Sequence, residues 1–298
     1  MTSKSLQNEN KSAALSRLFS PGVFRQLARD GRSDLLVRIL NEAELLEDLN
    51  TKTIGQVLDR AFQLSKAVEL RTEHTYKAAI THKILLGTHS LKTASLFTEF
   101  RVANSKADVV VVNGTSTVYE IKSERDSLER LESQIADYFK VFSRVNVICA
   151  EKHVRKILNT APGCVGILTL NRRFQISTVR EATDSNSKVD QAVVFDSLSL
   201  SESELIIKSL GRTVPDVPNT VKYQVLKEIF CELPSELLRH EVVKTLRNSR
   251  SALHLSEFIL QLPLSLQPLG ISTRIRKKDQ SRLLEVINQP AKNLLKWT

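Results

Sequence analysis

The sequence predicts an α/β protein in which a mixed β-sheet is flanked by helices, with helical regions at both ends of the chain. Three observations indicate this class. Apolar residues recur at helical spacing over residues 13–65, short apolar runs separated by turn signals fill residues 94–180, and helical spacing returns beyond residue 193. Helical and strand segments alternate in the middle of the chain, which is typical of a sheet with helices on its faces.

We expect three parts along the chain: a helical N-terminal region over residues 1–65, a central core over residues 66–182, and a helical C-terminal domain over residues 193–298. A polar segment, residues 181–192, predicts the linker before the last part. Within the core, residues 66–87 predict a helix that ends at Gly87. Residues 126–142 predict a second helix that begins with a capping box of Asp126 and Glu129.

The charge and the cysteines narrow the class of protein. A net charge of +10 favours a polyanionic partner such as nucleic acid. The densest basic run is "RIRKK" at residues 274–278, which is interpreted either as a solvated helical surface or as a nucleic-acid contact. The three cysteines are far apart and lack CxxC spacing, so we expect neither a disulfide framework nor a zinc site, and the simplest compartment is a reduced, cytoplasmic one.

Other classes are disfavoured by what the sequence lacks. It has no apolar run long enough to span a membrane and no apolar signal-peptide region, so we expect no membrane association. The six histidines form no HExxH motif, and no Walker-type loop is present. Neither a zinc-dependent hydrolase nor a nucleoside triphosphatase is therefore predicted.

The stretch "ADVVVVNGTSTVYEIKSE", residues 107–124, carries charge inside two predicted strands. Asn113-Gly114 is a strong hairpin signal. If Val112 pairs with Val118, then Asp108 lies opposite Lys122 and diagonal to Glu120, and all three side chains project from one face. Val109, Val111, Tyr119 and Ile121 would then line the other face as core.

Two carboxylates that converge beside an amine are costly unless a cation joins them. Mg²⁺ prefers oxygen ligands, and it is typically held by one or two carboxylates together with a phosphate oxygen. A metal bound in this way lowers the pKa of its water, which suits phosphodiester hydrolysis. The alternative is a surface hairpin with an ordinary Glu–Lys pair on its solvent-exposed face.

These residues resemble the PD-(D/E)XK nuclease superfamily. "AD" at 107–108 and "EIK" at 120–122 match its central D…ExK element, with Ala107 at the usual proline position, which the superfamily tolerates. "QIADY" at 134–138 matches the QxxxY pattern of the RecB-like branch. The resemblance covers about residues 66–180, and it is close to a bacterial family known only by a locus-tag name.

The resemblance implies a restriction-endonuclease-like core over residues 66–182 and a role for each motif residue. Asp108 and Glu120 would bind Mg²⁺ or Mn²⁺, with help from the backbone carbonyl of Ile121. Lys122 would handle the attacking water. Gln134 would approach the site from the next helix, and Tyr138 would support it one turn further along; each also has an ordinary structural interpretation, as a polar helix position and as core.

Many members of the superfamily add a glutamate from the helix that precedes the sheet. Glu73 lies on the inward stripe of the predicted 66–87 helix, and Glu99 lies on the first predicted strand. If residue 102 pairs with residue 108, Glu99 pairs with Val111 and faces away from Asp108. We therefore expect Glu73 to be the additional metal ligand.

The expected function is a Mg²⁺- or Mn²⁺-dependent nuclease that acts on nucleic acid. DNA is favoured over RNA because the superfamily mostly cuts DNA, and defence against phage or mobile DNA is suggested by analogy. The protein would act as a homodimer or with a protein partner. The alternatives are a non-catalytic module that binds nucleic acid or protein, and a nuclease subunit that is active only with its partner.

Overall fold

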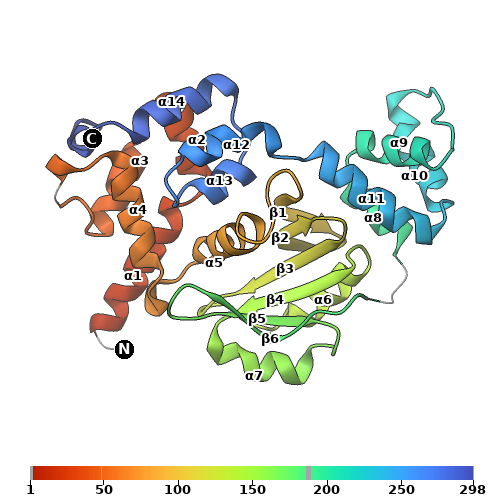
Figure 1. Cartoon of the computed structure of the whole chain (residues 1–298), viewed down its shortest axis with the longest axis horizontal. Helices are drawn as coiled ribbons and strands as arrows, with labels where there is room; N and C mark the ends of the chain where they lie inside the picture. Colours follow the sequence, from red (N-terminus) through yellow and green to blue (C-terminus); the bar gives the residue numbers. More distant parts are fainter. Residues whose placement is uncertain (1–2, 48, 186–188, 298) are drawn as a thin grey trace. The chain divides into compact units, whose positions relative to one another are not determined.

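The computed structural model describes residues 3–47, 49–185 and 189–297, and the chain divides into two compact units (Figure 1). The first, here called the helical unit, comprises Met1–Lys83, Asn171–Gln175 and His254–Thr298. The second, here called the sheet unit, comprises Ile84–Leu170 and Ile176–Leu253.

The helical unit combines segments from both ends of the chain. Its N-terminal elements are α1 (Ser3–Leu18), α2 (Pro21–Asp30), α3 (Asp34–Glu42), η1 (Leu49–Thr51), α4 (Ile54–Ser65), η2 (Val68–Leu70) and α5 (Glu73–Ala79). Its C-terminal elements are α12 (Ser256–Gln261), α13 (Gln267–Ser272), α14 (Lys277–Ile287) and η5 (Ala291–Lys296). The π-helix η3 (Ile80–Leu85) and the 3-10 helix η4 (Leu253–Leu255) lie at the sequence boundaries between the units.

Local signals set the helix starts in this unit. The Ser20 side chain caps α2 by accepting a hydrogen bond from the Val23 N–H, and Thr53 with Gln56 forms a capping box at the start of α4. The N-terminal and C-terminal segments of the unit are joined by two backbone hydrogen bonds. The Ile54 N–H donates to the carbonyl of Gln289, and the Ala291 N–H donates to the carbonyl of Lys52.

The sheet unit is built on six strands in sequential order: β1 (Ser95–Val102), β2 (Ser105–Val112), β3 (Ser116–Lys122), β4 (Arg144–Cys149), β5 (Gly166–Leu170) and β6 (Ile176–Arg180). β1, β2 and β3 are antiparallel neighbours, β3, β4 and β5 are parallel, and β5 pairs antiparallel with β6. Helices α6 (Leu131–Phe139) and α7 (Glu151–Thr160) make the two parallel crossovers.

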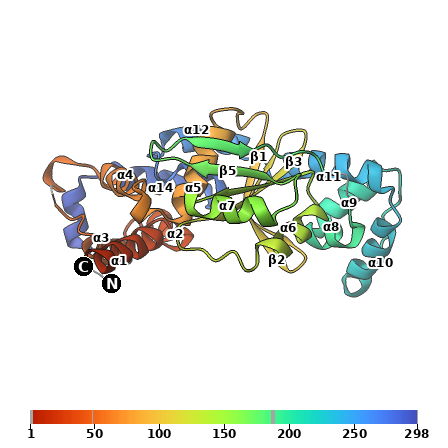
Figure 2. The same ribbon diagram turned by 90° about the horizontal axis from the view of Figure 1, so that it is seen from below.

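The core of the sheet unit lies on one face of this sheet. Helices α6 and α7 lie on the same side of the sheet (Figure 2). Residues of both helices form a single buried cluster with strand residues such as Val110, Val118 and Val147. The same cluster takes in the four helices that follow β6, which are α8 (Gln191–Ser197), α9 (Leu200–Ser209), α10 (Asn219–Cys231) and α11 (Ser235–Ser249). All seven residues of β3 are buried, and β3 lies between β2 and β4 inside the sheet.

The expected α/β class, a mixed sheet flanked by helices with helical terminal regions, is confirmed. The expected parts 1–65, 66–182 and 193–298 differ from the compact units, because the helical unit joins the first 83 residues to the last 45 while α8–α11 pack on the sheet. Residues 186–188 of the expected linker lie outside the described residues. Within the described part of the chain, no helix is both long and apolar enough to cross a bilayer.

The two hairpin turns are tighter than the sequence suggested, and the expected registers are wrong. Val112 pairs with Ser116, not with Val118, so the β2–β3 register is shifted by two residues. The loop between these strands has three residues and uses Gly114 at φ +102°. Val102 pairs with Ser105, so the β1–β2 turn has only two residues, and Val111 pairs with Leu96 instead of Glu99.

Two expected helix boundaries are also wrong. Residues 66–87 do not form one helix: the 3-10 helix η2 ends at Leu70, α5 begins at Glu73, and η3 follows as a π-helix. The helix after β3 begins at Leu131 instead of Asp126. The Asp126 carboxylate instead accepts hydrogen bonds from the backbone N–H and the hydroxyl of Ser123, which makes a local turn that competes with helix initiation.

Candidate metal and catalytic site

Glu120 and Lys122 are next-but-one neighbours on β3, so their side chains leave the same face of the strand. Lys122 Nζ donates a hydrogen bond of 2.9 Å to Glu120 Oε1. The Glu120 side chain is only 2% exposed and the Lys122 side chain only 7%. A buried ion pair at this spacing is held by mutual charge compensation, since either group alone would be costly to bury.

Gln134 and Tyr138 are one turn apart on α6 and therefore share a face of that helix. Lys122 Nζ donates a second hydrogen bond of 2.9 Å to Gln134 Oε1. The Tyr138 hydroxyl lies 2.6 Å from Glu120 Oε2 and 3.1 Å from the carbonyl oxygen of Lys106. Four of the residues expected at the site thus form one hydrogen-bond network between β3 and α6.

The environment of Tyr138 raises its pKa above the ordinary tyrosine value. Burial is the main cause, and the negative charge of Glu120, the hydrogen bond to it and the charge of Asp108 act in the same direction. The hydroxyl therefore remains a proton donor at neutral pH. Its role in this arrangement is to hold the carboxylate of Glu120 in place.

Asp108 is half-buried on β2 and is anchored to the backbone of β3. Its Oδ2 accepts a hydrogen bond of 2.7 Å from the backbone N–H of Ile121, the residue between Glu120 and Lys122. The strict alternation of faces is interrupted at this point of β2, because Ala107 and Val110 both belong to the buried cluster under α6. No such interruption was expected from the sequence.

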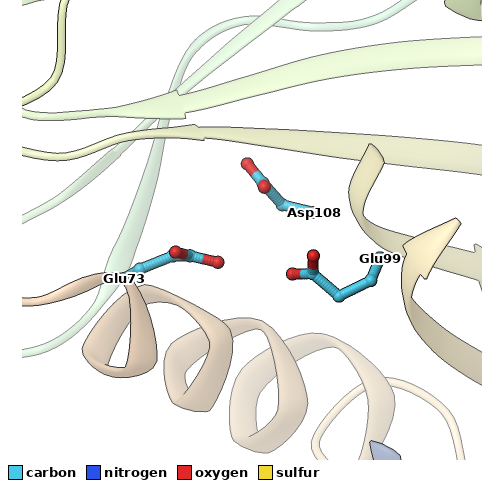
Figure 3. A group of neighbouring side chains, drawn as sticks. All are labelled: Glu73, Glu99 and Asp108. Atoms are coloured by element: carbon cyan, nitrogen blue, oxygen red, sulfur yellow. The ribbon is translucent and has the colours of Figure 1, made fainter. Parts of the chain in front are cut away.

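Glu99 lies beside Asp108, contrary to the expectation that it faces away. The pairs Thr98–Val109 and Phe100–Ala107 flank it, which puts Glu99 opposite Asp108. A carboxylate oxygen of each residue lies within 4.8 Å of one from the other (Figure 3). Lys106 Nζ also contacts Glu99 Oε2, at 2.5 Å. The expected pairing failed because it assumed a longer turn between the strands.

Glu99 has an unusual backbone conformation, with φ at +59° inside a strand. Residues with a Cβ rarely adopt this region, and such strain tends to occur at functional sites. The sequence gives no signal of it, since no glycine, asparagine or proline marks the position. A two-residue turn centred on Ala103 and Asn104 was the one feature from which the position of Glu99 opposite Asp108 could have been derived.

Glu73 is the first residue of α5 and belongs to the helical unit. Its carboxylate makes an ion pair of 2.6 Å with Lys77, one turn further along the helix, and its side chain is half exposed. Figure 3 draws it with Glu99 and Asp108. Because Glu73 lies in the helical unit and Asp108 in the sheet unit, the expected role of Glu73 as a metal ligand stays a prediction.

The chemistry available in the sheet unit falls into two adjoining parts. Asp108 and Glu99 offer carboxylate oxygens close enough to share one cation, and both are at least partly exposed. Glu120, Lys122, Gln134 and Tyr138 offer a buried network of fixed charge in which Gln134 alone is partly exposed. Asp108 joins the two parts through its bond to Ile121.

The fold and site together define a mixed α/β protein with an acidic pair beside a buried Glu–Lys network. The chain belongs to the family described as bacteriophage P4 protein cII, whose model matches residues 66–261. The matched range contains every candidate residue of the site, from Glu73 to Tyr138.

Two known proteins show the extent of the similarity. Protein cII of Enterobacteria phage P4 is 24% identical over 200 residues, which cover 64% of this chain and 74% of that protein. Among solved structures, the SPO1766 protein of unknown function from Silicibacter pomeroyi matches 42% of this chain and 87% of its own, at 16% identity and a TM-score of 0.28. That TM-score is too low to support a statement about the fold.

Proposed function

We propose that this protein is a nuclease that hydrolyses phosphodiester bonds with Mg²⁺ or Mn²⁺, and that DNA is its preferred substrate. The observation that carries the proposal is the single network in which Lys122 bonds both Glu120 and Gln134 while Tyr138 bonds Glu120. The ExK and QxxxY patterns are separate in the sequence, but the hydrogen bonds of Gln134 and Tyr138 join them in space. Asp108 is bonded to the backbone of Ile121, the middle residue of the ExK pattern.

The acidic groups fit a divalent cation. Asp108 and Glu99 are close enough to repel each other. Lys106 compensates part of the charge on Glu99, and a divalent cation between the two carboxylates would relieve the rest of the repulsion. We propose Asp108, Glu99 and Glu120 as protein ligands, with the backbone carbonyl of Ile121 as a further ligand from the sheet unit. When bound, such an ion polarises the phosphate and acidifies a coordinated water.

The remaining residues of the network would position the reacting groups and stabilise the charge that develops on the phosphate. Lys122 carries a third proton beyond its two hydrogen bonds, which can hold the attacking water or offset negative charge on the phosphate. Gln134 fixes the direction of the ammonium group, and Tyr138 fixes the Glu120 carboxylate. A preorganised set of this kind lowers the barrier because the groups need no rearrangement during the reaction.

Burial of Glu120 and Lys122 favours a second candidate function. With 2% and 7% of these side chains exposed, a phosphate reaches them only after the neighbouring segments move. The second candidate is therefore a module that binds nucleic acid or protein without cutting, or a nuclease subunit that a partner opens. The similarity to a phage protein supports a role connected with phage or mobile DNA under either candidate.

The test is a cleavage panel with plasmid DNA, single-stranded DNA and RNA in Mg²⁺, Mn²⁺ or EDTA. Wild type is compared with Asp108→Asn, with Lys122→Met, and with Glu129→Gln as a control that removes an exposed carboxylate nearby. Metal-dependent cleavage that both site variants lose and the control keeps supports the proposal. Cleavage that survives in both site variants refutes this site, and binding without cleavage by all proteins supports the second candidate.

A further inference from the structure

Five polar residues and one isoleucine line a cavity of about 360 Å³ within the helical unit: Arg25, Arg29, Arg274, Ile275, Arg276 and Asp279. Four of the six are arginines. The cavity lies between α2 and the segment that leads into α14, so it joins parts of the chain about 250 residues apart. It includes part of the "RIRKK" run, which the proposed catalytic site does not use.

The sequence places these arginines together for simple reasons. Arg25 and Arg29 are one turn apart on α2, on the side opposite its buried residues such as Phe24 and Leu27. α2 ends at Gly31 with φ at +72°, and a Cβ on that glycine would lie 3.4 Å from the side chain of Arg282 on α14. The middle of α14 therefore packs closely against the C-terminal end of α2.

Two of the four arginines are neutralised by neighbouring carboxylates. Arg29 bonds Asp30, and Arg276 Nε donates to Asp279 Oδ2, each at 2.8 Å. The side chains of Arg25 and Arg274 make no hydrogen bond or ion pair within the described residues, and both residues are exposed. The cavity therefore holds two uncompensated guanidinium groups, which are suited to bind the oxygens of a phosphate.

Asp279 provides a second, independent sign of a ligand. It is 5% exposed, and its Oδ1 has no hydrogen-bond partner within the described residues. The guanidinium of Arg282 lies 4.0 Å from this oxygen, which is too far for a hydrogen bond. Since a buried polar oxygen without a partner is costly, a ligand that donates a hydrogen bond there is favoured. A nucleotide unit combines such a donor, on its sugar or base, with a phosphate.

We propose that this cavity binds the phosphate backbone of a nucleic-acid strand, with Arg25 and Arg274 as the phosphate contacts and Asp279 as an acceptor for a sugar or base donor. A polymer is favoured over a small phosphorylated molecule because the basic surface extends beyond the cavity. Arg32, Lys277, Lys278 and Arg282 lie within three residues in sequence of a residue that lines the cavity, and all four are exposed. A strand several phosphates long uses this surface, whereas a small ligand does not.

The inference adds a strand-holding site to the proposed function, and its test is independent of cleavage. Binding of labelled single-stranded and double-stranded oligonucleotides is followed by fluorescence anisotropy in EDTA across a salt series. Wild type is compared with the double variant Arg25→Gln/Arg274→Gln, which removes no ion-pair partner from any carboxylate in the described residues. The matched control is Arg155→Gln/Lys156→Gln on α7, which removes two exposed cations that also lack partners within the described residues.

The double variant is expected to weaken binding about tenfold or more, and to reduce the slope of log affinity against log salt by roughly 1 to 2. The control variant is expected to keep most of the wild-type affinity and most of the salt slope. An unchanged thermal unfolding midpoint shows that each variant is folded. The proposal is overturned if the double variant binds like wild type, or if the control loses as much. It is also overturned if wild type binds pyrophosphate through these arginines but no oligonucleotide, since the ligand is then a small phosphorylated molecule.

Discussion

The Tyr138 hydroxyl lies 2.6 Å from the Oε2 atom of Glu120 and joins helix α6 to the central strand β3. Glu120 Oε1 is bonded by Lys122 at the same time, so each of its oxygens has one donor. The carboxylate is thereby held in a fixed orientation although it is almost fully buried.

The first prediction concerns this hydroxyl. Tyr138→Phe keeps the ring but leaves Glu120 Oε2 buried without its donor, so we expect the free energy of unfolding to fall by about 1–3 kcal/mol. Tyr223→Phe is the matched control, because it removes a 2.6 Å bond to Asp196 at an exposed position, where water replaces the lost partner. Urea denaturation measures the free energy of unfolding of both variants. Equal losses would show that the buried hydrogen bond stabilises the fold no more than the exposed one.

The second prediction concerns the buried ion pair. Glu120→Gln or Lys122→Met alone leaves one charge buried without its partner, and we expect each to cost about 3–5 kcal/mol. The double variant is expected to lose less than the sum of the two, because it leaves no unpaired charge. A double-mutant cycle by chemical denaturation measures this coupling. Additive losses would mean that the two groups do not stabilise each other.

The third prediction concerns the strained backbone at Glu99. Glu99→Gly and Glu99→Ala both remove the carboxylate, but only glycine tolerates φ at +59° without cost. In EDTA we expect the glycine variant to be about 1 kcal/mol more stable than the alanine variant. Both are expected to lose part of the stabilisation that Mn²⁺ gives wild type in thermal unfolding. An alanine variant at least as stable as the glycine variant would argue against strain.

The fourth prediction concerns pH. Burial of His74 is the main cause that lowers its pKa to about 3, from an ordinary value of 6.5. The ring stacks on Phe19, and its Nε2 lies 3.0 Å from the carbonyl oxygen of Ser265, so the neutral form donates there. Because the folded pKa is depressed, the stability that His74 confers is complete above pH 6.5 and is lost progressively as the pH falls toward 3.

His74→Gln removes this titration and retains a hydrogen-bond donor. Across that window we expect the slope of unfolding free energy against pH to fall by about 1.4 kcal/mol per unit, which corresponds to one proton. Denaturation at a series of pH values measures the slope, and the absolute stability at neutral pH does not enter the comparison. A slope equal to that of wild type would show that His74 is not the group responsible.

Local spacing was enough to predict which side chains of the hydrogen-bond network share a face of their strand or helix. The separation of two residues between Glu120 and Lys122 fixes a common face on a strand, and the separation of four between Gln134 and Tyr138 fixes a common face on a helix. Alternating helical and strand patterns likewise predicted the mixed α/β class. These features depend on neighbours in the sequence, where propensity and periodicity act directly.

Features set by turn geometry and by distant contacts were not predictable in the same way. The position of Glu99 depends on a turn of two residues, and one residue more or less moves a side chain to the other face. The positive φ of Glu99 arises from its surroundings and leaves no mark in the sequence. The helical unit joins α2 to α14, and nothing in the local pattern of either helix indicates the other.

The most direct test of the account is to locate the divalent ion. Crystals of the full chain soaked in Mn²⁺ are measured near the manganese absorption edge, with Asp108→Asn crystals as the control. The account predicts an anomalous peak within coordination distance of the Asp108 carboxylate in wild type, and its loss in the variant. A wild-type map with no peak at Asp108 would contradict it.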